Sequence, residues 1–544
     1  MDEPQMPPIQ LDQLRGAIKT FGRELFAYCL NINESEVEAI EGDLNRASSG
    51  IMPVLVDMVK NLTQIKLHLA ITDTPLEFSI SSIHLLEENG RKLSIFNLWR
   101  TQSGGDMPGF STGDRVMDAL ASALTDVYPV TIVFRHLANS PWHFTYTPDL
   151  APSIDLMRSF GEAVLADPYL ARLFPNPTDD KLDHSFYFVS NTGRAGSLQL
   201  AVFSSAVFRA AYSMFRFRQQ TSAVDLRDAV TSTLAILRSL AEGKVVSVPA
   251  WIGVGNIALP VDKVRLPWGT LRPYPEPTQV ELIPSNARPS ITVDADGKSW
   301  TLGAILETSF LSQLIVEPPR SEMAGVTWPS SMAREFAKLD EQFFDTSLAA
   351  MLATEGTPLA GCRRLWTAIF DPLSFGSYLS FKTDANPPVS AHILTDGEVE
   401  SMQEWGETLR SKPVKSIEIP QRRILSAVAE RVDPVDGFID AIIAWEALFA
   451  GTDQGELSFR ICAAMATLLH DSQTARLDEH KRLVKLYNKR SKVLHGAQEI
   501  TQSDAIESRD YAVRVALDCI KKLFLNHPEM LQDSDRSKKI ILGL

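Results

Sequence analysis

The sequence predicts a multidomain α+β protein with helical segments at both ends and a mixed α/β region between them. Its 544 residues are enough for three or four domains at roughly 150 residues each. Strand-like runs bounded by turn residues occur in the first half of the chain. Amphipathic helical patterns dominate the second half. We therefore expect a helical segment at 1–70, a mixed α/β region at 71–330, a helical connector at 331–416 and an all-α bundle at 417–544.

Composition and charge limit the classes of function. The chain is 44% hydrophobic and 22% charged, which is typical of a globular protein. Its net charge of −14 disfavours attraction of DNA or anionic lipid by bulk charge, so a nucleic acid would need a local basic patch. The four cysteines are dispersed, with no spacing typical of a zinc site or a disulfide framework. We expect no metal and no other cofactor.

Two further patterns bear on location. The acidic, proline-containing start lacks an apolar signal region. The most apolar stretch, residues 438–451, is short and is interrupted by Asp440 and Glu446, so it does not predict a membrane span. We expect a cytoplasmic protein that does not enter a membrane.

Short helices are expected between residues 11 and 48, where "NIN" at 31–33 marks a tight turn. The run "ELFAYCLNINESEVEAIEG" from Glu24 to Gly42 resembles the helix-turn-helix of the Xre/Cro type. Its second helix would carry carboxylates, which repel the DNA backbone. We interpret the segment as a degenerate motif used for protein contacts, with DNA binding as the alternative. These carboxylates are Glu34, Glu36, Glu38, Glu41 and Asp43.

Strands are expected next, at "KLSIFNLW" (92–99), "YPVTIVFRHL" (128–137) and "HFTYTP" (143–148). Two hairpins are expected as well, one turning at Asn191-Thr192-Gly193 and the other at Asp296-Gly297. Their order in a sheet does not follow from the pattern.

Several motifs in this half of the chain do not indicate a site. "GVGNIA" at 253–258 has the spacing of a dinucleotide-binding loop, but Pro260 follows it, so no helix begins there to hold a pyrophosphate. His136 and His143 lie in an apolar segment and are expected to be structural. His470-Asp471 is an isolated pair rather than a metal-binding set.

After Pro319 the pattern becomes helical and is expected to remain so to the end of the chain. Asp433-Pro434 indicates a helix start, and Gly451 and Gly496 indicate helix ends. Helices joined by short loops predict a bundle.

The bundle contains "KRLVKLYNKRSK", Lys481–Lys492, with six basic residues and no acidic one. A solvated helix face is the ordinary interpretation of such a run. Here apolar residues are expected to fix the helix to a core, and His495 follows near the helix end. These anchoring residues are Leu483, Val484, Leu486, Tyr487, Val493 and Leu494.

Cleavage of RNA without a metal needs a group that transfers a proton and a cation that binds the phosphate. A histidine with a pKa of about 6.5 suits the first task, and an arginine suits the second. Arg490 and His495 are therefore the candidate catalytic residues, with a structural or RNA-binding role as the alternative. Residues five apart on a helix point about 140° apart, so we expect two copies to combine their residues in a dimer.

Neighbouring residues are assigned supporting roles. Lys489, Lys492 and Ser491 are candidates for contact with RNA. Tyr487 either stacks on a base or packs in the core. Glu446, in the apolar run "AWEALF", is expected to pair with an arginine such as Arg460 and to hold the bundle together.

"LYNKRSKVLHG" resembles the R-x4-6-H signature of the HEPN superfamily, and especially of the ApeA-like HEPN domains. The helices "AVAERVDPVDGFIDAIIAWEALF" and "ELSFRICAAMATLL" are similar to the two that precede the signature in that family. The resemblance spans roughly residues 417–527 and implies a metal-independent endoribonuclease. In the family the RNA 2′-hydroxyl attacks the adjacent phosphate and leaves a 2′,3′-cyclic phosphate. His495 would be the general acid–base and Arg490 the phosphate-binding cation. Ser491 departs from the Asn, Asp or His that often follows the arginine in active members.

The resemblance also implies a role in bacterial anti-phage defence by abortive infection. RNA would be the substrate, a homodimer would form through the bundle, and the N-terminal region would respond to a phage-derived trigger or partner. Two alternatives remain open. One is a non-catalytic scaffold that binds RNA or protein, and the other is a transcriptional regulator that uses residues 11–48.

Overall fold

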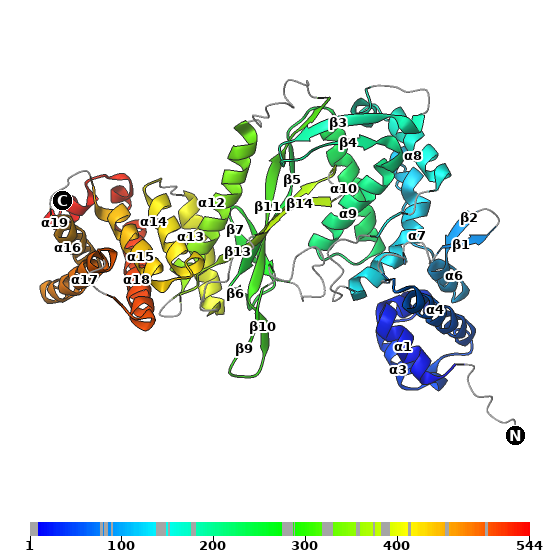
Figure 1. Cartoon of the computed structure of the whole chain (residues 1–544), viewed down its shortest axis with the longest axis horizontal. Helices are drawn as coiled ribbons and strands as arrows, with labels where there is room; N and C mark the ends of the chain where they lie inside the picture. Colours follow the sequence, from blue (N-terminus) through cyan, green and yellow to red (C-terminus); the bar gives the residue numbers. More distant parts are fainter. Residues whose placement is uncertain are drawn as a thin grey trace.

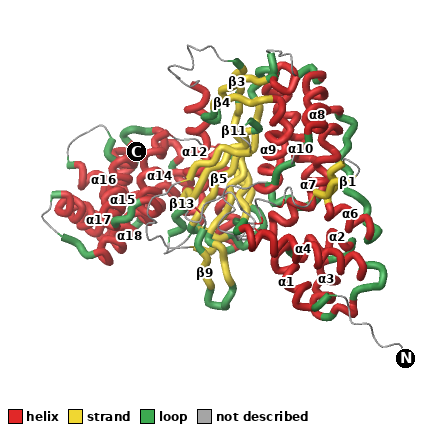
Figure 2. The backbone as a smooth tube through the Cα atoms, turned by 45° about the vertical axis from the view of Figure 1, so that its right-hand side comes forward, coloured by secondary structure: helices red, strands yellow, loops and turns green. Residues whose placement is uncertain are grey.

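The protein is elongated, with helices at both ends and β-sheet between them (Figure 1). This computed structural model describes residues 9–74, 76, 80, 85–88, 91–137, 148–150, 153–175, 181–274, 287, 289–317, 330–354, 359–373, 376–381, 392–411, 415–451, 456–495 and 499–544. Helices and strands together form a mixed α+β architecture (Figure 2). His143, Gly496 and most of the expected strand at 143–148 lie outside the described residues.

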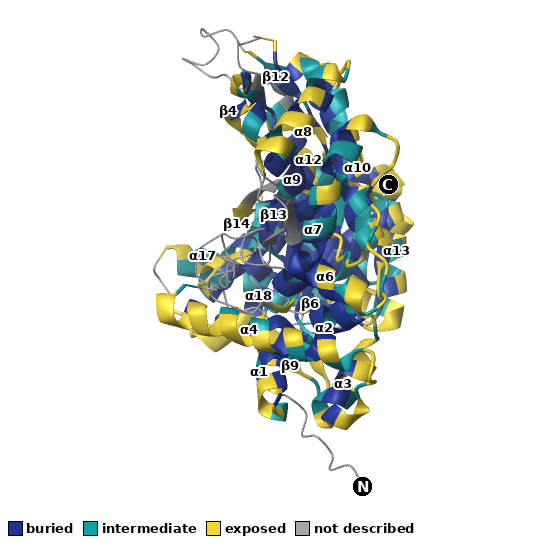
Figure 3. Cartoon of the chain, turned by 90° about the vertical axis from the view of Figure 1, so that its right-hand side faces the viewer, coloured by how far each residue is buried: buried dark blue, intermediate teal, exposed yellow. Residues whose placement is uncertain are grey.

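The N-terminal region is helical, as predicted. It comprises α1 (Leu11–Phe21), α2 (Arg23–Leu30), α3 (Glu34–Gly42) and α4 (Met52–Thr72). Asn31 adopts the left-handed conformation with φ 54° at the end of α2, and the Asn33 side chain caps α3 by accepting from the Glu36 N–H. The predicted tight turn at residues 31–33 is therefore confirmed. The outer face of α4 is exposed (Figure 3).

Two of the expected strands are largely or wholly helical. In residues 92–99 only the start is strand: β1 (Leu85–Glu88) pairs with β2 (Arg91–Ser94), and α6 (Ile95–Gln102) follows. Residues 128–137 form the last part of α7 (Arg115–Leu137). Val130, Ile132, Val133 and Phe134 are all buried, so this helix is apolar around most of its circumference. An apolar run of that kind does not distinguish a buried helix from a strand.

Pro129 lies inside α7, where it lacks the N–H that would bond to the Thr125 carbonyl one turn earlier. The side chain of Asn97, on α6, supplies the missing donor, and its Nδ2 lies 2.8 Å from that carbonyl oxygen. This buried hydrogen bond explains why the helix tolerates a proline in its interior.

Both predicted hairpins are present. β3 (Ser185–Ser190) pairs with β4 (Ala195–Gln199), with Gly193 at φ 97° in the turn, and β12 (Leu314–Val316) joins the other side of β3. β9 (Ile291–Val293) pairs with β10 (Ser299–Thr301), with Gly297 at φ 81°. α8 (Ile154–Ala166) precedes the first hairpin, and α9 (Phe203–Phe217) and α10 (Ala223–Ala241) lie between the two hairpins.

The largest sheet has six strands in the order β14-β13-β5-β11-β8-β7, all antiparallel. Its strands are β5 (Val246–Gly255), β7 (Val264–Leu266), β8 (Gly269–Pro273), β11 (Gly303–Ser312), β13 (Arg363–Asp371) and β14 (Gly376–Phe381). Residues 253–258 continue from β5 into β6 (Ile257–Ala258) without starting a helix. A Cβ on Gly253 would lie 2.3 Å from the Trp366 indole nitrogen, so this glycine allows close strand packing.

The sheet overturns the expectation of a purely helical connector at 331–416. α12 (Ser330–Ala353) and α13 (Asp396–Ser411) are helical, but β13, β14 and β15 (His392–Ile393) lie between them. β13 is apolar and almost wholly buried between β5 and β14. Its partner β5 is far away in sequence, so local pattern alone does not reveal the pairing.

The C-terminal region is a helical bundle, as predicted. It contains α14 (Lys415–Leu425), α15 (Pro434–Phe449), α16 (Leu457–Leu469), α17 (Gln473–Leu494), α18 (Gln502–Asn526) and α19 (Arg536–Leu542), with a π-helical turn at Ser426–Glu430 after α14. Asp433 caps α15, and Gly451 follows its end with φ 64°.

Two hydrophobic cores organise the described residues. One joins α1–α4 with α6–α10, and the other runs from the six-stranded sheet into the bundle. The expected domain boundaries therefore remain a prediction. Within the described residues, one helix, Arg115–His136, is long and apolar enough to cross a membrane, and 61% of its most apolar window is buried. That burial is typical of a core helix.

Candidate functional site

The candidate site lies on α17, the helix that carries the basic run. The Ser472 side chain caps its start by accepting from the Ala475 N–H. Leu483 is fully buried, and Val484, Leu486 and Tyr487 pack against the core of the bundle. This face fixes the helix, as the sequence predicted. Leu494, which was also expected to anchor it, is 48% exposed, because it lies in the last turn and projects beyond the core.

His495 terminates α17. Its backbone N–H donates to the Ser491 carbonyl at 3.2 Å, and the residue is exposed. The imidazole is therefore open to solvent at the end of a helix that the core holds in place.

Arg490 faces α15. Its NH1 lies 3.7 Å from Glu446 Oε1, and both side chains are largely shielded, at 21% and 23% exposure. The Tyr487 hydroxyl donates to the same oxygen at 2.7 Å. Burial raises the pKa of Tyr487, and its hydrogen bond to Glu446 raises it further, so the phenol remains a donor. These three side chains form what we call the Glu446 cluster.

The Glu446 cluster corrects one expectation and refines another. The arginine beside Glu446 is Arg490, whereas Arg460 donates to the Ala450 carbonyl at the end of α15. Glu446 lies on the helix face that α17 covers, and sequence spacing does not predict that face. Tyr487 packs within the bundle, so the core interpretation of this residue agrees with its position.

The other predicted RNA contacts differ in accessibility. Lys489 is turned towards α18, where its ammonium group contacts Asp504 and donates to the Ser508 hydroxyl at 2.9 Å. Its side chain is only 17% exposed, so its charge is committed inside the bundle and the expected contact with RNA is not supported. Lys492 is exposed, and Ser491 is partly buried beside it. Lys492 therefore remains the lysine best placed to reach a ligand.

Arg490 and His495 do not share one face of the chain. They are five residues apart, which corresponds to about 140° around a helix, and the guanidinium is held at α15 while the imidazole lies at the helix end. The Nε of Arg490 is buried, with no hydrogen-bond partner in the part of the chain that the structure describes. The guanidinium thus has a loose ion pair and an unused donor.

The structure also contains features that the sequence analysis missed. Arg423 and Arg431 both bind the buried carboxylate of Asp440, at 2.7 and 2.6 Å. A basic groove lies between α17 and α18, lined in part by Arg482 and Tyr511. The repeated polar residues on one face of α18, at positions 511, 514, 518 and 522, were the available signal for this groove. Within the described ranges, no group of three or more His, Cys, Asp or Glu residues is arranged to hold a metal ion.

Comparisons with known proteins identify no relative. No protein-family model, no curated protein and no solved structure matches the chain. The function must therefore be argued from the residues themselves.

Proposed function

We propose that the chain is a metal-independent endoribonuclease of the HEPN type, which cleaves RNA with His495 as general acid–base and Arg490 as phosphate-binding cation. It would act in the cytoplasm as the regulated toxin of an abortive-infection response. The observation that carries the proposal is an exposed histidine at the end of a rigidly packed helix, five residues after an arginine whose ion pair is loose.

The position of His495 suits proton transfer. A histidine side chain can serve both as proton acceptor and as proton donor. It needs access to substrate on one side and a fixed backbone on the other, and the end of α17 provides both. Proton transfer of this kind contributes about 10²–10⁴-fold to a rate.

Arg490 suits a phosphate because its present partner can be replaced. An ion pair of 3.7 Å is longer than the 2.7–2.9 Å or so of a strong charge-assisted hydrogen bond. A phosphate offers more acceptor oxygens than the Glu446 carboxylate, one of which also accepts from Tyr487. In this proposal Glu446 holds Arg490 in a resting position, and RNA competes for it.

The reaction would combine residues of two copies. One His495 accepts the proton of the attacking 2′-hydroxyl, and the His495 of the other copy donates a proton to the departing 5′-oxygen. The new bond joins the 2′-oxygen to phosphorus and the bond to the 5′-oxygen breaks, which gives a 2′,3′-cyclic phosphate and a 5′-hydroxyl. Arg490 stabilises the additional negative charge on the phosphate oxygens.

The remaining three quarters of the chain would then sense an infection trigger and restrain the nuclease. Division of the chain into a sensing part and a nuclease bundle belongs to the proposal. Its support is the shared core, which runs from the central sheet into the bundle and so connects the two parts mechanically.

The test is RNA cleavage by the full chain in the presence of a chelator, followed by analysis of the RNA ends. Wild type should produce 2′,3′-cyclic phosphate and 5′-hydroxyl ends. His495→Ala should lose about 10²–10⁴-fold in rate without loss of thermal stability, because the side chain is exposed. His527→Ala is the matched control: it removes another partly exposed histidine that follows the end of a bundle helix, α18.

Equal cleavage by wild type and His495→Ala would remove this histidine from the mechanism. Arg490→Ala should also abolish cleavage, whereas Arg490→Lys should retain a part of it because one charge is kept. Salt-sensitive binding of RNA that remains intact with every variant would instead identify a non-catalytic RNA-binding scaffold.

A further inference from the structure

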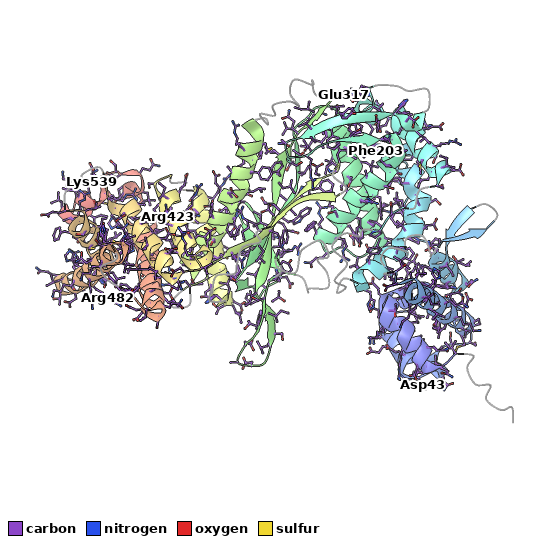
Figure 4. All side chains as sticks on the ribbon, viewed as in Figure 1. Asp43, Phe203, Glu317, Arg423, Arg482 and Lys539 are labelled. Atoms are coloured by element: carbon purple, nitrogen blue, oxygen red, sulfur yellow. The ribbon has the colours of Figure 1, made fainter. Side chains whose placement is uncertain are left out.

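A second candidate site lies in the bundle, away from the Glu446 cluster. It is a cavity of about 570 Å³ between the end of α16, the first half of α17 and the second half of α18. We call it the α18 groove. Its volume is within the roughly 300–1,000 Å³ typical of sites for small ligands. Figure 4 marks Arg482, which lines it, on the bundle at the opposite end of the molecule from Asp43.

The charge of the α18 groove is opposite to that of the chain. Four permanently basic residues line it against two acidic ones, Glu479 and Asp518, in a protein of net charge −14. Burial raises the pKa of Asp518, and the nearby Lys521 and Arg514 oppose that shift. The basic residues are Arg482, Arg514, Lys521 and Lys522.

One end of the groove contains a cation–π pair. The Arg482 guanidinium carbon lies 3.7 Å from the centre of the Tyr511 ring. The Tyr511 hydroxyl donates to Glu479, and Glu479 lies 4.0 Å from His470 Nε2. These contacts fix the ring, while Arg482 itself is exposed. A guanidinium plane held in this way offers its outer face to a nucleobase, because bases stack on arginine planes as well as on aromatic rings.

The other end of the groove carries concentrated positive charge. Arg514 lies one turn beyond Tyr511, and its NH1 donates to the Thr354 carbonyl at 3.0 Å, which fixes its position. Lys521 and Lys522 follow about two turns further along α18. The distance along the helix from Tyr511 to Lys522 is about 16 Å at 1.5 Å per residue. Val515 and Leu469 supply apolar surface between these charges.

We propose that the α18 groove binds a nucleobase joined to a chain of phosphates. The base stacks on Arg482 above Tyr511, and the phosphates extend along α18 past Arg514 to Lys521 and Lys522. A nucleoside triphosphate and a short segment of single-stranded RNA share this chemistry, and both are long enough for the groove. Binding here does not depend on the proposed cleavage reaction.

The experiment measures binding by the full-length His495→Ala protein in chelator at low salt, using calorimetry. The probes are ATP, inorganic triphosphate and a trinucleotide of RNA. ATP should bind roughly tenfold or more tightly than triphosphate, because base stacking is typically worth that much. Arg482→Ala should abolish this difference, and Lys521→Ala/Lys522→Ala should weaken both ligands by about tenfold or more. Lys481→Ala/Lys485→Ala is the matched control, since these lysines lie on α17 but do not line the groove.

Each outcome has a distinct meaning. Competition between the trinucleotide and ATP identifies an RNA strand as a ligand of the groove, and binding of ATP alone identifies a free nucleotide. Equal affinity for ATP and triphosphate, or unchanged binding in the Lys521/Lys522 variant, would overturn the proposal, as would no binding of either nucleotide probe. Absence of RNA cleavage by the wild-type protein, with ATP binding intact, would count only against the proposed nuclease. Circular dichroism of each variant checks that the helices remain folded.

Discussion

The two helical ends of the protein hold their carboxylates differently. In the N-terminal helices, Arg23 pairs with Glu41 at 2.8 Å and with Glu38 at 3.6 Å, and Glu38 is 67% exposed. In the bundle, Arg423 and Arg431 pair with Asp440, which is only 3% exposed. The arginines are similarly accessible in the two regions, at 39% and 42%. The two networks therefore differ mainly in the burial of the acid.

This difference has consequences for both stability and surface charge. Exposed ion pairs contribute about 0–1 kcal/mol, because water solvates either partner alone. A buried carboxylate that loses its cations has no such compensation. The N-terminal end also displays acids on α3, whereas the bundle shields Asp440 and Glu446 in contacts with its own cations and exposes lysines. Similar helical packing thus supports opposite surfaces.

The largest expected effect on stability is at Asp440. Replacement of both cations in Arg423→Ala/Arg431→Ala should lower the free energy of unfolding by about 3–5 kcal/mol, measured by urea denaturation. The reason is that the carboxylate remains buried without a cation. Of its side-chain contacts within the described residues, the hydrogen bond from the Ser426 hydroxyl at 3.2 Å remains.

Arg23→Ala is the matched variant at the other end, and it should cost at most about 1 kcal/mol. Equal losses of unfolding free energy from the two changes would show that burial of the carboxylate does not determine how much its ion pairs stabilise the protein. A smaller loss in the double arginine variant than in Asp440→Ala would contradict the same argument.

A second prediction compares the two surfaces as ligands for nucleic acid. On the His495→Ala background, Lys492→Ala should weaken binding of single-stranded RNA. It should also reduce the slope of log affinity against log salt by up to about 0.7 for each lysine that contacts a phosphate. Fluorescence anisotropy at several salt concentrations provides the measurement.

The acidic end supplies the contrast. A duplex containing the protein's own promoter should show no mobility shift attributable to α3, and Glu34→Ala/Glu36→Ala should leave RNA binding unchanged. If the promoter duplex does shift, and Glu34→Lys/Glu36→Lys changes that shift without changing RNA binding, the result would support the DNA-binding interpretation of residues 11–48.

The smallest expected effect comes from Asp345, a partly buried acid between these ends. Burial raises the pKa of Asp345, and nearby Glu341 and Glu418 raise it further, although Gln421 donates to it at 3.2 Å. The folded protein therefore retains a proton here that the unfolded chain releases as pH rises above about 3.9. Stability from this group falls with rising pH through that window. Asp345→Asn should raise the denaturation midpoint at pH 7 and have little effect on it near pH 3.5. A lower midpoint at pH 7 would contradict the assignment.

The sequence predicted features that depend on neighbouring residues. The turn at Asn31, the two glycine-containing hairpins, the capped start of α15 and the anchored face of α17 all follow from local pattern. Prediction from the sequence failed where a residue far away in the chain determines the local structure. Residues 128–137 are helical because other helices bury them, and β13 is a strand because β5 pairs with it. At the candidate site the pattern identified α17, but it did not show that Lys489 faces α18 or that Glu446 faces Arg490.

The contact between the bundle and the sheet region has a practical implication for any attempt to isolate the bundle. A Cβ on Gly361, just before β13, would lie 2.3 Å from the Val428 side chain, and Arg514 reaches across to the carbonyl that ends α12. Cutting the chain near residue 416 would separate the sheet region from the fragment that carries His495 and leave apolar surface of that fragment uncovered. Limited proteolysis at that point is therefore expected to give an insoluble product rather than a separately folded bundle.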